Sequence, residues 1–79
     1  MKYIMFRHDG MEEFVIFSDA LCHSDVAHHL RGEQVSSAGF VVFGEAGGVQ
    51  CYGESLSLGL KSRGQEDALR ISAYNEAFS

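Results

Sequence analysis

Proline and tryptophan are absent from this sequence, and cysteine occurs only twice, at Cys22 and Cys51. Two cysteines are too few for a disulfide framework and lack the paired spacing of a zinc knuckle, so we expect two reduced, buried side chains. The longest uncharged run, from Val35 to Gly44, is far shorter than the roughly 20 residues that a membrane span requires. The sequence therefore predicts no disulfide framework, no transmembrane helix and no membrane partner.

Basic residues are also scarce, since six lysines and arginines stand against eleven acids and leave a formal net charge of −5. Direct phosphate binding needs a basic face, so we expect no direct binding to nucleic acid. The start of the chain lacks the apolar segment and cleavage site of a signal peptide, and the expected location is the cytoplasm. The acidic balance leaves a basic protein partner open.

What the chain does contain is enough apolar surface for a core. The apolar fraction is 46%, and neither a repeat nor a linker interrupts the sequence, so we predict a single domain over residues 1–79. Lys2–Arg7 and Glu12–Phe17 are rich in β-branched and aromatic residues. The Asp9-Gly10 pair between them is typical of a tight turn, and together these segments predict a β-hairpin.

A second hairpin is predicted from Gln34–Gly44 and Val49–Lys61, because the glycines of the intervening EAGG suit a tight reversal. Within it, SLSLGLK alternates leucine with small residues at the two-residue period of a strand. The leucines expected on one buried face of that strand are Leu56, Leu58 and Leu60. The interruption at Gly53-Glu54 predicts a bulge or bend just before it.

Two helices are predicted. The first runs from about Ser24 to Arg31, with Ser24 as its N-cap and Gly32 just after its end. The second runs from about Arg63 to Phe78, since Ser62 and Gln65 have the spacing of a capping box. Its apolar residues at helical spacing are Ala68, Ile71, Tyr74 and Phe78. The order ββαββα predicts an α+β domain, with two helices on an antiparallel sheet of four to five strands.

The first hairpin is apolar at successive positions, so both of its faces require a cover. Two helices are expected to cover only one face of the sheet. The other face then needs sheet curvature, a second copy of the chain or a different protein, because exposed apolar patches usually mark interfaces. We therefore predict a homodimer or a complex with a protein partner. The hairpin residues predicted to contact it are Tyr3, Met5, Phe14 and Ile16.

Residues 20–31, ALCHSDVAHHLR, contain one cysteine, three of the four histidines and an aspartate. At about 100° per residue, a helix here has a sheet-facing sector with Cys22 at its margin. That sector consists of His23, Val26, Ala27 and Leu30. The opposite, exposed side consists of Asp25, His28 and His29, which we include among the predicted partner-binding residues.

These histidines are poorly spaced for a metal. A helical zinc pair needs two histidines about four residues apart, whereas the separations here are five, six and one. Asp25 with His28 and His29 has the i,i+3 and i,i+4 spacing of ordinary surface pairs. We expect neither a metal nor another cofactor, although Asp25, His28 and His29 are the candidates if one binds. A catalytic or pH-sensing histidine is a further alternative.

The run from SAGFVVF through CYGESLSLGLKSR to EDAL resembles small uncharacterised proteins of phages and prophages. The resemblance implies that the chain is a binding or inhibitory factor rather than an enzyme, because small acidic α+β phage proteins often have such roles. It assigns no functional residue.

We therefore predict a non-catalytic, acidic, cytoplasmic protein that acts by binding a macromolecular partner, such as a phage accessory or inhibitory factor acting on a host protein. One alternative is a small metal-dependent or histidine-assisted enzyme that uses Cys22, His23, Asp25, His28 and His29. Another is a structural subunit of a larger assembly such as a virion.

Overall fold

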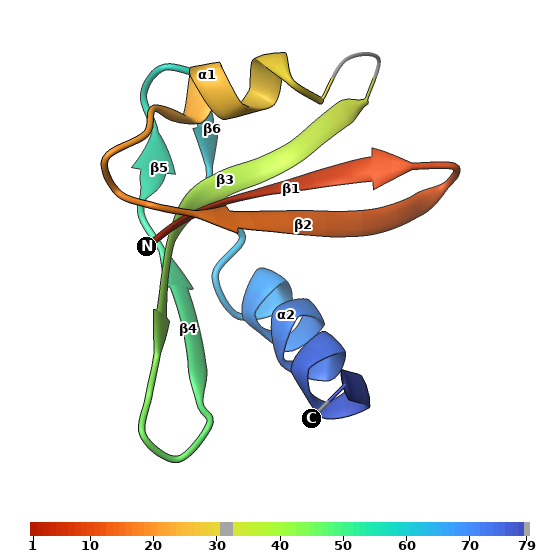
Figure 1. The fold of residues 1–79 in the computed structure, drawn as a ribbon, viewed down its shortest axis with the longest axis vertical. Coiled ribbons are helices and arrows are strands. Elements are labelled where there is room, and N and C mark those ends of the chain that lie inside the picture. Colours follow the sequence, from red (N-terminus) through yellow and green to blue (C-terminus); the bar gives the residue numbers. More distant parts are fainter. Residues whose placement is uncertain (31–32, 79) are drawn as a thin grey trace.

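The computed structural model of the chain describes residues 1–30 and 33–78, with side chains as far as residue 74. Within these residues, a four-stranded antiparallel sheet has the order β2-β1-β3-β4, and β5 and β6 form a separate two-stranded ribbon (Figure 1). This arrangement confirms the predicted α+β class. The elements in chain order are β1 (Lys2–His8), β2 (Met11–Phe17), α1 (His23–His28), β3 (Gln34–Phe43), β4 (Val49–Tyr52), β5 (Glu54–Ser55), β6 (Leu60–Lys61) and α2 (Gln65–Phe78).

The first hairpin is formed as predicted. β1 and β2 pair in a continuous antiparallel register that ends at the His8–Met11 pair. Asp9 and Gly10 connect them with positive φ values of 52° and 80°. Positive φ at both central residues is what a type I′ turn requires, and this turn matches the twist of the strands it joins.

The two helices lie on opposite faces of the sheet, which corrects the expectation that they cover one face (Figure 1). On one face, α2 packs onto the sheet through a core cluster of Tyr3, Met5, Val41, Cys51, Ala68 and Ile71. On the other face, α1 and the β5–β6 ribbon cover a cluster centred on Ile4, Phe17 and Ala38. The chain thus covers both apolar faces of its first hairpin, and no second copy is needed for that purpose.

A bulge in β3 changes which of its side chains face each side of the sheet. Met5 pairs with Ser37 but the next residue, Phe6, pairs with Val35, so Ser36 is an extra residue in β3. One extra residue reverses the alternation of side chains along a strand. Val35 and Ala38 therefore face the same side and pack in the cluster beneath α1.

The segment SLSLGLK forms a tight turn rather than the predicted continuous strand. β5 ends at Ser55 and β6 begins at Leu60, and Gly59 between them has a φ of 67°. The buried Ser55 accepts a hydrogen bond at its Oγ from the Leu58 backbone at 3.3 Å, which stabilises the turn. Leu58 and Leu60 pack against the core, but Leu56 is 86% exposed. The bend predicted before this segment is present at Gly53, where φ is 78°.

Both helices begin at other residues than predicted. α1 begins at His23 with Cys22 at the N-cap, and no side chain caps it, so the Ser24 cap is wrong. Arg31 and Gly32, predicted to end this helix, lie outside the described residues. α2 begins at Gln65, two residues later than predicted. Ala68 and Ile71 are buried as expected and Tyr74 is half exposed, whereas the Phe78 side chain lies outside the described part.

The turn after β5 makes a prediction about two leucines. Leu56→Ala should change the free energy of unfolding by less than about 0.5 kcal/mol, because this side chain is almost fully exposed. Leu60→Ala should lower it by about 1 kcal/mol, because this side chain is half-buried against the core. Urea unfolding followed by circular dichroism measures both values, and equal losses would mean that Leu56 is buried as in a strand.

Candidate functional site

The structure separates the four predicted hairpin residues into two pairs. Tyr3 and Met5 are 0% exposed in the core beneath α2, so they offer no contact surface, and the prediction for these two is wrong. Phe14 and Ile16 on β2 are half-buried and pack at the border of the same cluster. The difference arises because β1 is a central strand and β2 is an edge strand of the sheet.

The histidine-rich segment divides as its helical geometry predicts. Asp25, His28 and His29 are exposed. His23 is buried between Phe17 and Phe40, with ring centroids 5.4 and 5.9 Å away in edge-on geometry. Its Nε2 lies 2.9 Å from a backbone carbonyl oxygen of β3 and donates a hydrogen bond to it. His23 is therefore satisfied as a core residue.

These side chains do not converge on a common centre. The rings of His28 and His29 lie 5.9 Å apart between centroids, nearly perpendicular to each other. In the described part of the chain, no three side chains of His, Cys, Asp and Glu are grouped so that they could hold a metal ion. Cys22 is exposed, contrary to prediction, because it precedes α1 instead of packing under it, whereas Cys51 is buried as predicted.

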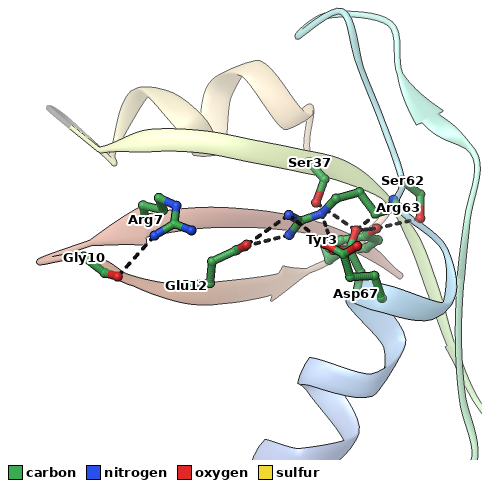
Figure 2. Close-up of polar contacts among 9 residues, drawn as sticks. Tyr3, Arg7, Gly10, Glu12, Ser37, Ser62, Arg63 and Asp67 are labelled. Atoms are coloured by element: carbon green, nitrogen blue, oxygen red, sulfur yellow. Dashed lines mark hydrogen bonds and ion pairs between the residues drawn. The ribbon is translucent and has the colours of Figure 1, made fainter.

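A buried carboxylate, Asp67 on α2, is the centre of the polar contacts within the fold, and the sequence patterns did not single it out (Figure 2). Its Oδ2 accepts hydrogen bonds from the Tyr3 hydroxyl at 2.5 Å, from Ser37 Oγ at 2.8 Å and from the Arg63 backbone at 3.0 Å. Its Oδ1 accepts a fourth from Arg63 Nε at 2.8 Å. The carboxylate therefore ties the start of α2 to β1 and β3.

Arg63 extends these contacts to the edge strand β2. Its Nη1 and Nη2 donate to the two carboxylate oxygens of Glu12 at 2.9 and 2.6 Å, in the bidentate geometry that makes such pairs strong. Glu66 lies 3.1 Å from Nη1 on the solvent side. Figure 2 shows the guanidinium between Glu12 and Asp67, so that one cation joins β2 to α2.

The protonation states follow from these contacts. Burial by itself raises the pKa of Asp67, but hydrogen bonds from Tyr3, Arg63 and Ser37 and the charge of Arg63 outweigh it, and the net shift is downward. The hydrogen bond from Arg63 likewise lowers the pKa of Glu12. Burial, with the hydrogen bond to Asp67, raises the pKa of Tyr3 above its usual range. Both carboxylates are charged at neutral pH, and Tyr3 keeps its proton.

Burial raises the pKa of the Cys51 thiol to about 11, with a further contribution from the charge of Asp67. The thiol is therefore protonated at neutral pH, and a thiol is a much weaker nucleophile than a thiolate. Tyr3, Ser37 and Arg63 all donate hydrogen bonds to Asp67. The chemistry of this cluster is that of a structural link between helix and sheet.

A groove of about 510 Å³ lies between β2 and α2, at the open edge of the sheet. Phe14 and Tyr74 form its apolar wall, with ring centroids 5.3 Å apart in edge-on geometry. The groove is next to the Arg63–Glu12 contact, which keeps α2 beside the edge strand. Its lining residues are Met11, Glu12, Glu13, Phe14, Arg70, Ala73 and Tyr74.

Comparisons with known proteins yield no relative: no family model, no curated protein and no solved structure matches the chain. Within residues 1–30 and 33–78, no helix is long and apolar enough to cross a membrane. The functional assignment therefore depends on the geometry of the groove and of the sheet edge.

Acid should destabilise the protein through Asp67 and Glu12. A carboxyl group whose pKa is lowered in the folded state contributes stability that is present above its unfolded pKa, near 4, and lost as the pH falls through the folded pKa. We expect urea unfolding to show a free energy that falls steeply below about pH 4.

Glu12→Gln should flatten part of this acid dependence, whereas Glu45→Gln, an exposed residue of the β3–β4 turn, should preserve it. Asp67→Asn should flatten it further, if the variant retains its fold. Equal acid dependence in wild type and Glu12→Gln would show that the contact with Arg63 does not lower the pKa of Glu12.

Proposed function

We propose that the chain acts by binding another protein, and that the groove between β2 and α2 is the contact surface. The observation that carries this proposal is the position of an apolar groove directly at an unpaired edge of the sheet. Sheet edges and concave apolar surfaces are both regions where proteins receive partner segments.

The groove has the composition of a binding surface. Met11 is 69% exposed and Tyr74 is 53% exposed, although both have large side chains that are normally covered. Phe14 lies half-buried against Tyr74, and Glu12 and Arg70 supply charged groups to the lining of the groove. An apolar centre with aromatic side chains and a charged rim is typical of protein interfaces.

Of the hairpin residues predicted from the sequence to contact a partner, Phe14 lines this groove. Asp25, His28 and His29 belong to α1 on the other face of the sheet, so their role in partner contact is a separate prediction. An enzyme that uses the histidines and a structural subunit of a virion gain no support from any contact described above. A homodimer likewise gains no support from these contacts and is a separate proposal.

We propose the cellular location of the protein and the kind of partner it binds on chemical grounds. Both cysteines are free thiols, as is usual in the cytoplasm, where we place the protein. The net charge of −5 favours a basic protein over a nucleic acid as the partner. An accessory or inhibitory factor of a phage that binds a host protein fits this description, and the phage origin stays a prediction.

Selection from a displayed library of random twelve-residue peptides tests the binding surface without a known partner. Selected peptides should shift the amide resonances of β2 and of α2 near Ala73. Tyr74→Glu should weaken their binding by on the order of tenfold or more, because it places a charge at the apolar wall of the groove.

Tyr52→Glu is the matched control, since it makes the same chemical change at an equally exposed tyrosine on β4, the opposite edge strand of the sheet. It should leave the affinity unchanged. Peptides that shift the resonances of α1 and not those of β2, or that bind both variants equally, would contradict the proposed surface.

A further inference from the structure

Among the described residues, the backbone of β2 pairs with another strand on one side only. Met1 and Val41 exchange two backbone hydrogen bonds of 3.1 and 2.8 Å. Because the backbone groups of successive residues point to alternate sides of a strand, the odd-numbered residues of β1 direct theirs toward β3. Its even-numbered residues therefore bond to β2, where they pair with odd-numbered residues. The β2 residues whose N–H and C=O groups face the open edge are thus Glu12, Phe14 and Ile16.

This edge lacks three of the features that usually protect a sheet edge, namely shortness, a bulge and proline. β2 is seven residues long and pairs with β1 in a continuous register without a bulge. The chain contains no proline, and no strand of the described residues pairs with the outer side of β2. Long, regular, apolar edges of this kind are templates for an added strand, which many proteins use to bind extended peptides.

The two sides of β2 present different chemistry to an added strand. Phe14 and Ile16 point to the face covered by α2, where the groove lies, so side chains of the added strand on this face would enter an apolar space. Glu12 points to the same face, but both of its carboxylate oxygens already accept hydrogen bonds from Arg63. Apolar residues are therefore preferred at these alternate positions.

Glu13 points to the opposite face and is exposed. The ion pairs seen among the described residues do not include it, and the nearby imidazole of His8 is bonded to Glu33 at 2.6 Å. An opposite charge directly across from it on a neighbouring strand is favourable, and a like charge is unfavourable. With a net charge of −5 on the chain, this position favours lysine or arginine.

Taking the proposed binding surface as given, we infer that its occupant is an extended partner segment that pairs with Glu12, Phe14 and Ile16 as a further strand. The segment places apolar side chains in the groove beside α2 and a basic side chain next to Glu13. This edge therefore recognises an alternating apolar and basic sequence.

A second copy of the chain fits this edge less well. Two β2 strands that pair about a twofold axis at Phe14 would use the same outward backbone groups. This register places Glu13 opposite Val15 of the second copy, so the glutamate stays without a cation. Each copy also adds a net charge of −5, which opposes association.

Two fluorescein-labelled seven-residue peptides, valine alternating with lysine and valine alternating with glutamate, test the charge preference by fluorescence anisotropy. The lysine peptide should bind the wild-type protein at least about tenfold more tightly, and Glu13→Lys should reverse this preference. Glu45→Lys makes the same change in net charge on the distant β3–β4 turn, and it should leave the preference in place.

Hydrogen exchange tests the backbone pairing. The bound lysine peptide should slow the exchange of the Glu12, Phe14 and Ile16 amides, while those of Glu13 and Val15, already bonded to β1, should change little. Ile16→Pro removes one outward N–H and should abolish binding. Ile16→Ala removes the side chain, retains the N–H and should bind.

Each contrary outcome has a distinct meaning. Equal binding of both peptides, or loss of the preference in Glu45→Lys, overturns the basic specificity. Binding without protection of the three outward amides overturns strand addition, while the groove found with displayed peptides still stands as the binding surface. A dimeric mass in sedimentation, with these amides protected in the free protein, assigns the edge to a second copy instead. If displayed peptides avoid β2 and α2 altogether, the proposed function itself fails.

Discussion

The rest of this fold depends on the hydrogen bonds that the buried carboxylate of Asp67 accepts. Its four hydrogen bonds come from Tyr3 on β1, Ser37 on β3 and the backbone and side chain of Arg63 before α2. Burial of a charge is costly unless it is fully paired, and here every buried polar side-chain atom of the described residues has a partner. The cost of a wrong arrangement is thus high, and α2 is held in one position on the sheet.

The position of α2 in turn creates the proposed binding surface. Arg63 uses the rest of its guanidinium to hold Glu12, so that the start of the helix is fixed to the edge strand β2. Further along, the helix and the strand are separated by the groove, with Phe14 and Tyr74 in contact at its wall. The same ion pair occupies both carboxylate oxygens of Glu12 and leaves Glu13 as the exposed acid of the strand. One structural contact therefore shapes both the groove and the charge pattern beside it.

Local patterns predicted the strands of the sheet, the Asp9-Gly10 turn and the exposed face of α1 well, because neighbouring residues decide these features. They failed where distant residues decide. The alternation in SLSLGLK is real, but Ser55 and Gly59 form a turn there, and the core reaches only the last two of its leucines. Tyr3 and Phe14 look equally apolar in sequence, and only the strand order buries one and leaves the other at the edge.

By itself, the sequence determined the class of the fold and the net charge of −5, since composition and residue spacing carry that information. Only the tertiary structure decided that the helices lie on opposite faces, that Asp67 is the buried centre and that β2 is an open edge beside a groove. These features join residues up to 64 positions apart in the chain, such as Tyr3 and Asp67. No local pattern encodes them, because they depend on which strand lies in the middle of the sheet.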